Sequence, residues 1–173
     1  RTISTPKAMK IDSIIIKKRY DRLAPYFDGL EAAMEGLFFQ RWRQKLWAGV
    51  KGHHILEVGV GTGKNFDYYP KNARITAIDF SAKMLKQAMK KRHRKNITVD
   101  LELMDTQSLA YADNSFDTVI ASFVFCSVPQ PHKGLKELYR VCKPGGQVLL
   151  LEHVQSSQPF LAKIMTAINP LVV

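Results

Sequence analysis

Apolar and polar positions alternate along residues 54–152 in a way that predicts strands and helices in turn. Short apolar stretches of strand length are separated by segments with helical spacing and by turns rich in glycine, proline or asparagine. The expected strands are 54–58, 74–78, 97–103, 116–121 and 147–152, and the expected helices are 64–69, 81–92 and 131–142. This order is typical of an α/β fold, so we expect a mostly parallel sheet with helices on both faces.

The first 50 residues show helical spacing instead. Thr5-Pro6 is typical of a helix start, because threonine caps the first turn and proline needs no hydrogen bond there. A turn at Asp28-Gly29 precedes a second expected helix. The apolar residues of the two helices are Ala8, Ile11, Ile14 and Ile15, then Leu30, Ala33, Met34, Leu37 and Phe38. We therefore expect a helical segment over residues 1–50 and a core over residues 51–173, within one domain.

Only one further helix, at 159–168, is expected after the strand at 147–152. Sheets of this kind usually continue beyond that point. We therefore expect that the natural protein is longer and that C-terminal strands are missing from this sequence.

The composition is that of an ordinary globular chain. Its 173 residues contain no apolar run long enough to cross a bilayer. No apolar stretch near Arg1 leads to a small-residue cleavage site, so a reducing, cytoplasmic setting is expected. Cys126 and Cys142 are the only cysteines, and we expect both to be reduced thiols in the core.

The net charge adds a prediction about partners. A formal charge of +11 favours an acidic partner surface, either nucleic acid or anionic lipid. The basic residues concentrate in two stretches, 7–22 and 83–95. The alternative is that both stretches are solvated helix faces, as most charge runs are.

A glycine-rich turn is the first candidate for chemistry. Glu57-Val58-Gly59-Val60-Gly61-Thr62-Gly63 follows an expected strand, and its glycines let the backbone approach a ligand closely. The spacing is G-x-G-x-G, whereas dinucleotide enzymes carry G-x-G-x-x-G around a pyrophosphate. The turn therefore indicates a cofactor site of another kind.

Two acidic residues follow the next two expected strands. Asp79 is placed to accept hydrogen bonds from both hydroxyls of a ribose. Asp105 is placed to accept from an adenine amino group, and a backbone amide near Thr106 would serve a ring nitrogen. The alternatives are that Asp79 only flanks the helix starting at Ser81 and that Asp105 is an ordinary loop residue.

Taken together, these residues resemble the class I S-adenosylmethionine-dependent methyltransferases over about residues 50–155. The resemblance also includes Asp113-Asn114-Ser115-Phe116-Asp117 and Pro144-Gly145-Gly146. Val60 departs from the family, which often has cysteine or alanine there. The resemblance implies a Rossmann-like sheet that binds S-adenosylmethionine at the carboxyl ends of its strands, with Glu57 and the glycines near the methionine moiety. The cofactor site is then expected to comprise Glu57, Gly59, Gly61, Gly63, Asp79, Phe80, Met84, Asp105, Thr106 and Ser122.

Three further segments indicate the methyl acceptor by resemblance. Residues 20–28 are similar to the N-terminal segment of bacterial phospholipid N-methyltransferases and of ubiquinone/menaquinone C-methyltransferases. Phe125-Cys126-Ser127-Val128 and Leu151-Glu152-His153-Val154 look closest to the phospholipid branch, and they are also similar to alkyl thiol methyltransferases. In such enzymes a basic amphipathic N-terminal helix binds the membrane and covers the active site.

This resemblance implies roles for three residues in catalysis. Tyr20 and Tyr26 would border the cofactor and the acceptor, and His153 would hold a phosphate or polar head group. The alternatives are that the tyrosines pack the N-terminal helix onto the core and that His153 merely ends a strand. No metal is expected, because Cys126, Cys142, His132 and His153 lack a recognisable ligand spacing.

The sequence therefore favours methyl transfer by in-line displacement, in which alignment of donor and acceptor is the main task. The expected acceptor is a lipid or small lipophilic molecule, foremost the amine of phosphatidylethanolamine, at the inner face of an anionic membrane. A quinone precursor, an alkyl thiol, an RNA substrate and a binding module without catalysis are the alternatives. Nucleic acid is disfavoured, because no Asn/Asp-Pro-Pro-aromatic motif is present.

Overall fold

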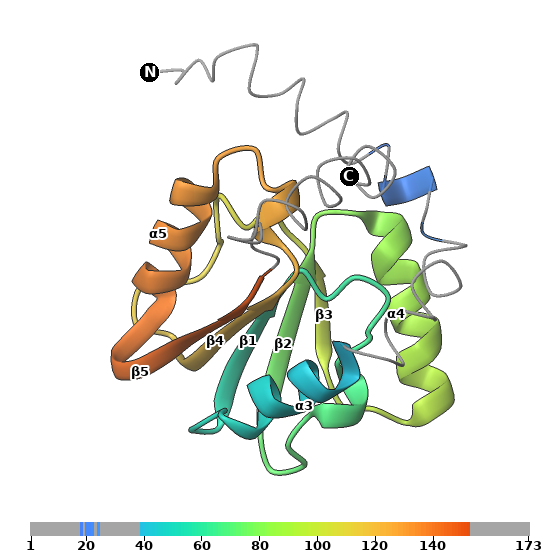
Figure 1. Cartoon of the computed structure of the whole chain (residues 1–173), viewed down its shortest axis with the longest axis horizontal. Helices are drawn as coiled ribbons and strands as arrows, with labels where there is room; N and C mark the ends of the chain where they lie inside the picture. Colours follow the sequence, from blue (N-terminus) through green and yellow to red (C-terminus); the bar gives the residue numbers. More distant parts are fainter. Residues whose placement is uncertain (1–17, 19, 23, 25–38, 153–173) are drawn as a thin grey trace, which may run out of the picture.

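The computed structural model describes residues 18, 20–22, 24 and 39–152. In this part of the chain, parallel strands form one sheet in the order β3-β2-β1-β4-β5 (Figure 1). The strands are β1 (His54–Val58), β2 (Arg74–Asp79), β3 (Asp100–Leu103), β4 (Phe116–Ser122) and β5 (Cys142–Leu151). The helices are α3 (Gln40–Ala48), α4 (Ala82–Lys95) and α5 (Pro131–Val141), with 3₁₀ turns η2 (Phe66–Tyr68) and η3 (Phe125–Ser127). The expected parallel α/β sheet is confirmed.

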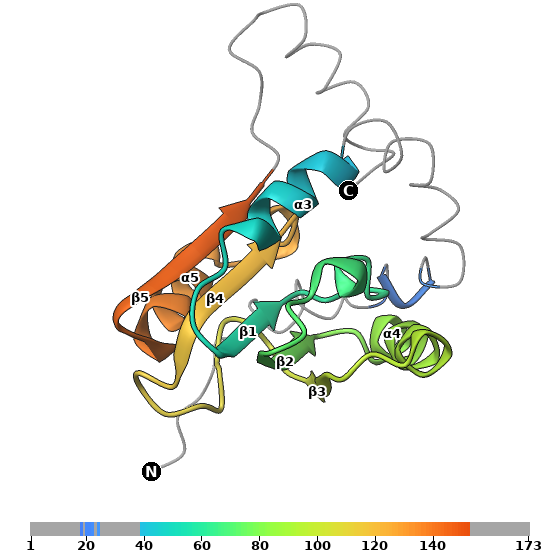
Figure 2. The same ribbon diagram turned by 90° about the horizontal axis from the view of Figure 1, so that it is seen from below.

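Helices cover both faces of this sheet. α3 and α4 pack on one face and α5 packs on the other, as Figure 2 shows from the edge of the sheet. Side chains of a strand alternate between the two faces. Ile55 of β1 accordingly packs on the α3 and α4 side, and Leu56 and Val58 pack on the α5 side. All three are fully buried, and so is Glu57, which interrupts the apolar residues of this central strand between Leu56 and Val58.

α4 begins where the sequence predicted a helix cap. The Ser81 hydroxyl accepts a hydrogen bond from the backbone N–H of Met84 at 3.2 Å. The helix ends at Asn96, whose φ of 51° lies in the left-handed region that asparagine tolerates. It is one turn longer than expected, because residues 93–95 continue the helical hydrogen bonding.

β3 is shorter than the expected strand at 97–103. Its pairing with β2 begins only at Asp100, opposite Thr76. Ile97 and Val99 still pack under α4 in the core, so the apolar alternation is real. Apolar alternation indicates that one face of the segment is buried. The strand begins only where the backbone of β2 lies alongside to form hydrogen bonds.

Two other boundaries differ from the prediction. The expected helix at 64–69 is only the 3₁₀ turn η2, because Tyr69 precedes Pro70 and takes an extended ψ of 129°. β5 begins at Cys142 rather than at 147. Its register shifts between the Phe116 and Thr118 positions of β4, so residues 143–146 form an irregular stretch with Gly145 at φ 76°.

Asp117 fastens the amino ends of the strands together. Its Oδ2 accepts from the backbone N–H of His53 at 2.8 Å and of His54 at 2.9 Å. Its Oδ1 accepts from Lys143 Nζ at 2.7 Å. The lysine and the two backbone donors hold the pKa of Asp117 well below its ordinary value. The Asp-Asn-Ser-Phe-Asp segment therefore stabilises the edge of the sheet opposite the expected cofactor site.

Several predictions lie outside the described residues. These are the helices expected before residue 39, the helix at 159–168 and any strands beyond it, and they stay predictions. α3 lies inside the predicted N-terminal segment 1–50, and it packs on the sheet through Trp47, which is buried. The division into segment and core therefore also stays a prediction.

The structure also shows where the two cysteines lie and whether a described helix could span a membrane. Neither cysteine forms a disulfide within the described residues, and Cys142 is buried as expected. Cys126 is exposed, so its placement in the core was wrong; it lies in the 3₁₀ turn η3 at the surface. Within the described residues, no helix combines the length and the apolar character needed to span a membrane.

Candidate cofactor and acceptor site

The glycine-rich turn folds over the end of β2. The backbone N–H groups of Gly59 and Val60 both donate to the carbonyl oxygen of Ile78 at 2.9 Å. Gly59, Gly61 and Gly63 have φ values of 70°, 55° and 79°, which residues with side chains rarely adopt. The sequence therefore forms this turn because glycine is present at each second position.

The three glycines face different surroundings. A Cβ on Gly59 would lie 2.4 Å from Val124 Cγ2, and one on Gly63 would lie 2.4 Å from Phe66 Cε2. A Cβ on Gly61 would meet no atom of the described residues within 4 Å. The outer two glycines are thus required by packing, whereas Gly61 borders open space at the carboxyl end of β1, where ligands bind in such sheets.

Asp79 joins this turn to the start of α4. Its Oδ2 accepts from the backbone N–H of Gly61 and its Oδ1 accepts from that of Ser81, each at 2.8 Å. The residue is 6% exposed, and burial raises the pKa of Asp79 to about 6, with a smaller effect of nearby Asp21 in the same direction, although the backbone N–H groups of Ser81, Gly61 and Phe80 favour the ionised form. Each carboxylate oxygen keeps a second lone pair for a ligand hydroxyl.

Glu57 stands at the centre of a buried polar cluster on the same edge. Asn65 Nδ2 donates to its Oε1 at 2.5 Å, and the hydroxyl of Tyr69 donates to its Oε2. Asn65 Nδ2 also donates to Ser122 Oγ at 2.9 Å. Arg43 Nη1 donates to Asn65 Oδ1 and to Ser122 Oγ, each at 3.0 Å. We call these five residues the Glu57 cluster.

The charge of Glu57 is finely balanced. Complete burial raises its pKa to about 7, although the bonds from Tyr69 and Asn65 and the nearby Arg43 favour the ionised form. Glu57 and Asp79 thus place two carboxyls at one edge, and both favour a cationic ligand that enters beside them. Strongly shifted carboxyls in one place are typical of functional sites.

Asp105 and Thr106 follow β3 at the same edge of the sheet. Asp105 Oδ1 accepts from the backbone N–H of Gln107 at 2.9 Å, and Gln107 Nε2 lies 3.1 Å from both carboxylate oxygens. Asp105 is exposed and Thr106 is buried. A ligand amino group would therefore share the Asp105 carboxylate with Gln107.

Aromatic side chains lie beyond the Glu57 cluster, at the end of β4. The ring of Phe123 lies 4.9 Å from that of Phe39, and the Arg43 guanidinium lies 4.9 Å from the Phe123 centroid. Trp42 lies 6.1 Å from Phe39 and is 48% exposed. We call Phe39, Trp42 and Phe123 the aromatic rim. Its accessible ring surface comes from Trp42 and in part from Phe123, because Phe39 is buried.

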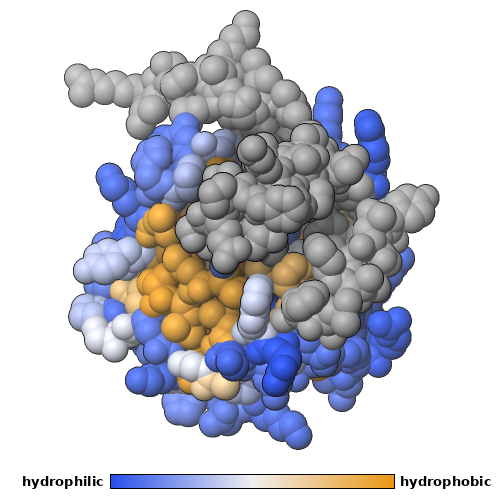
Figure 3. Space-filling view, viewed as in Figure 1, coloured by the Kyte–Doolittle hydropathy of each residue, from blue (hydrophilic) through white to orange (hydrophobic). Residues whose placement is uncertain are grey.

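The surface beside the rim is also apolar. Figure 3 shows apolar side chains gathered over β4 and β5 on the face that carries α3. Leu149 and Leu151 of β5 are only half-buried, and Leu149 packs against this side of the core. Apolar surface of this kind suits a lipophilic partner.

The remaining predicted residues are placed as follows. Tyr20 contacts Phe80 edge to face, with ring centroids 5.8 Å apart, next to the end of β2. Met84 is fully buried in the first turn of α4. Tyr26 and His153 lie outside the described residues, whereas Glu152 is described and its Oε1 accepts from the backbone N–H groups of Val124 and Phe125. The roles of all predicted site residues stay predictions.

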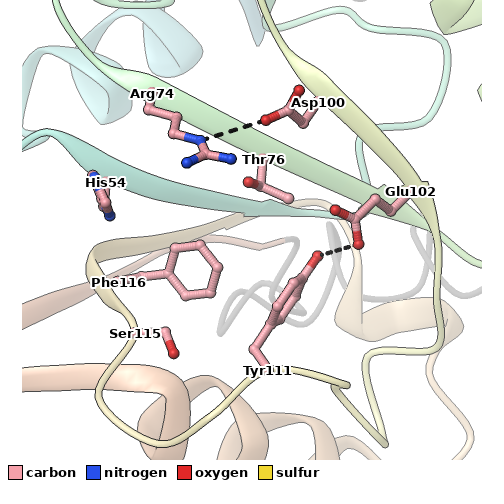
Figure 4. A pocket seen from close by; sticks show the side chains of 8 residues that line it. All are labelled: His54, Arg74, Thr76, Asp100, Glu102, Tyr111, Ser115 and Phe116. Carbon is pink, nitrogen blue, oxygen red and sulfur yellow. Dashed lines mark hydrogen bonds and ion pairs between the residues drawn. The ribbon is translucent and has the colours of Figure 1, made fainter.

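The opposite edge of the sheet carries a pocket of another character. Its volume is about 250 Å³, and its polar groups pair with one another (Figure 4). Arg74 forms an ion pair with Asp100 at 3.5 Å, and the Tyr111 hydroxyl donates to Glu102 at 2.9 Å. These residues lie toward the amino ends of the strands, so the pocket is separate from the glycine-rich turn.

Sequence reasoning missed three members of the Glu57 cluster. Arg43, Asn65 and Tyr69 were not expected to take part, although all three surround Glu57. One signal was available for Arg43. Phe39, Arg43 and Trp47 are spaced by four residues, so an arginine occupies the otherwise apolar stripe of a helix.

Comparisons with known proteins agree with this geometry. A family model described as a methyltransferase domain matches residues 56–150. The chain is 33% identical over 162 residues to a phosphatidylethanolamine N-methyltransferase of Cereibacter sphaeroides. This match covers 92% of this chain and 77% of the relative. It is 34% identical over 151 residues to the ubiquinone/menaquinone biosynthesis C-methyltransferase UbiE of Bdellovibrio bacteriovorus. This second match covers 84% of this chain and 64% of the relative. The chain belongs to the class I S-adenosylmethionine-dependent methyltransferases.

A solved structure shows the same fold. A SAM-dependent methyltransferase from Thermotoga maritima superposes with a TM-score of 0.67 at 21% identity, covering 86% of this chain and 66% of that one. The methyl donor follows from the family to which this chain belongs and is S-adenosylmethionine, and the residues present fit it. Gly61 leaves open space, Asp79 offers lone pairs to ribose hydroxyls, and the carboxyl of Glu57 suits the cationic amino-acid end.

Gly61→Ala should separate binding from folding in this methyltransferase. The new Cβ enters the open space, so we expect about tenfold weaker binding of S-adenosylmethionine. The left-handed φ of 55° should cost about 1 kcal/mol of unfolding free energy. Calorimetric titration and thermal unfolding measure the two effects.

The matched control is Gly145→Ala. Gly145 also has a positive φ, 76°, and also meets no described atom within 4 Å, but it lies at the amino end of the sheet. It should lose stability without losing affinity. Equal loss of affinity in both variants would show that Gly61 does not face the ligand.

Proposed function

We propose that this methyltransferase acts on a lipid or small lipophilic acceptor, and that the acceptor is the amine of phosphatidylethanolamine. The aromatic rim carries the proposal. At the end of β4, Trp42 presents an exposed ring and Phe123 a half-buried one, both packed near the buried Phe39, and Phe123 also contacts Arg43 of the Glu57 cluster. Aromatic faces attract ammonium groups and also contact acyl chains, so they suit a methylated amine on a lipid.

Different groups of described residues would bind the cofactor and position the acceptor. Bound S-adenosylmethionine supplies a methyl group attached to a positively charged sulfur. Glu57 would hold its amino-acid end and Asp79 its ribose, and the aromatic rim would exclude water and hold the amine in line with the methyl group. The amine must be neutral to attack, and the nitrogen gives up one proton after transfer.

Two further observations support a lipid acceptor. The relative from Cereibacter sphaeroides, itself a phosphatidylethanolamine N-methyltransferase, matches along 92% of this chain. The formal net charge of +11 favours an anionic membrane surface, where each basic side chain contributes about 1 kcal/mol. We therefore also propose a peripheral position on the inner face of the membrane, with Tyr20, Tyr26 and His153 near the acceptor.

A methyl-transfer assay tests the acceptor. The purified protein is incubated with methyl-labelled S-adenosylmethionine and vesicles of phosphatidylethanolamine and phosphatidylglycerol. The expected product is monomethylated phosphatidylethanolamine, identified by mass spectrometry of the extracted lipids. Vesicles in which phosphatidylcholine replaces phosphatidylethanolamine are the control and should take up no label.

Parallel reactions distinguish the alternatives. Demethylmenaquinone, an alkyl thiol and tRNA are offered under the same conditions. Faster labelling of the quinone or the thiol would replace phosphatidylethanolamine as the acceptor within the lipophilic class. Labelling of tRNA alone would overturn the lipophilic class, and binding of the cofactor without transfer to any acceptor would favour a binding module.

A further inference from the structure

We propose that Arg43 of α3 is a positioning residue for cofactor binding, because it fixes Asn65 and Ser122 and thereby sets the orientation and charge of Glu57. The proposal rests on the placement of the cofactor's amino-acid end beside Glu57. It does not depend on which acceptor receives the methyl group.

The position of Arg43 is unusual for a cation. The residue is 6% exposed and comes from a helix that packs on the sheet, 22 positions before Asn65 and 79 before Ser122. Its Nη1 donates to both of these residues at 3.0 Å, and its guanidinium lies over the ring of Phe123. One side chain thus connects α3, the segment that follows the glycine-rich turn, and the end of β4.

The donor and acceptor pattern leaves Asn65 a single orientation. A guanidinium only donates hydrogen bonds, so the amide oxygen of Asn65 must face Arg43. The amide nitrogen must then face Glu57 and Ser122, as its distances of 2.5 Å and 2.9 Å show. Without Arg43 the amide can turn over, and its oxygen would then oppose the Glu57 carboxylate.

Arg43 also supplies the positive charge near Glu57. The groups that face this carboxyl are Tyr69 from the segment after η2, Asn65 from the loop, Asp79 from β2 and Arg43 from α3. Asp79 opposes ionisation of Glu57, and the other three favour it. Removal of Arg43 should therefore raise the pKa of Glu57, so that more of the carboxyl is protonated at neutral pH.

The test compares three variants on the same helix. Arg43→Met removes the charge and the donors, Arg43→Lys keeps the charge, and Arg41→Met is the control because Arg41 is exposed. The dissociation constant of S-adenosylmethionine is measured by calorimetry across pH, together with KM and kcat on the best acceptor found. Thermal unfolding of each variant reports its folding.

For Arg43→Met we expect about tenfold weaker cofactor binding at neutral pH. As the pH is lowered, Glu57 becomes protonated earlier, so affinity should begin to fall at a higher pH than in the unaltered protein. KM for S-adenosylmethionine should rise more than kcat falls. Arg43→Lys should restore the pH profile, and Arg41→Met should match the unaltered protein in all readouts.

A purely structural role would give a different result. Arg43→Met would then unfold at a lower temperature while its pH profile of binding stayed the same, and that outcome overturns the proposal. If Arg43→Met does not fold, Arg43→Gln takes its place, because glutamine keeps a donor but loses the charge. The profile must then shift in Arg43→Gln and not in Arg43→Lys. Failure of the unaltered protein and of Arg41→Met to bind the cofactor would instead contradict the cofactor site itself.

Discussion

Asp79→Asn should weaken the binding of S-adenosylmethionine by about 100-fold, or about 3 kcal/mol. The carboxylate has two tasks that asparagine performs only in part. Its two oxygens accept the backbone N–H groups of Gly61 and Ser81, which fixes the turn against α4. In the expected cofactor site its remaining lone pairs would accept the ribose hydroxyls, and hydrogen bonds to a charged group are worth about 1.5–3 kcal/mol each. Calorimetry with S-adenosylmethionine and with its demethylated product measures the loss.

Asp100→Asn is the matched control for this substitution. Asp100 is exposed at the amino end of β3 and pairs with Arg74, so its loss should leave cofactor affinity unchanged. Affinity of Asp79→Asn within a factor of about two of the unaltered protein would remove Asp79 from the ribose site.

The parts of the site predicted from sequence share one property. The glycine-rich turn, Asp79 and Asp105 each follow a strand directly, and parallel strands bring their carboxyl ends to one edge. Strand order therefore places these residues together without any knowledge of side-chain packing. For this reason the apolar pattern predicted the sheet, and the residues that follow its strands predicted the edge at which the candidate site residues meet.

The parts that sequence did not predict depend on contacts across the fold. Arg43 reaches Ser122 from 79 positions away, and no local pattern encodes that pairing. Tyr69 was expected in a helix, but the extended backbone before Pro70 leaves its hydroxyl pointing at Glu57. The start of β3 was misjudged for a similar reason, because apolar alternation reports burial whereas a strand needs a partner.

Glu57→Gln should change cofactor binding and stability in opposite directions. In the expected cofactor site Glu57 would lie next to the cationic amino-acid end, where a buried carboxylate contributes about 3 kcal/mol, so we expect at least about 100-fold weaker binding. Without cofactor, however, burial raises the pKa of Glu57 from 4.5 to about 7. A group that binds its proton more tightly in the folded state favours folding while it is protonated.

The pH dependence of stability gives this prediction its sign. The contribution of Glu57 is fully present below pH 4.5 and is lost as the pH rises through about 7, where the ionised carboxyl costs about 3 kcal/mol. Glutamine stays neutral, but it meets the donors of Tyr69 and Asn65 with one acceptor fewer. We therefore expect the free energy of unfolding of Glu57→Gln to exceed that of the unaltered protein by about 1–2 kcal/mol above pH 7. In acid this difference should become smaller. Urea unfolding at several pH values measures this, with Glu102→Gln at the opposite edge as the control. A variant that is less stable in mild alkali, or that still binds the cofactor, would show that the buried charge of Glu57 is not kept for the ligand.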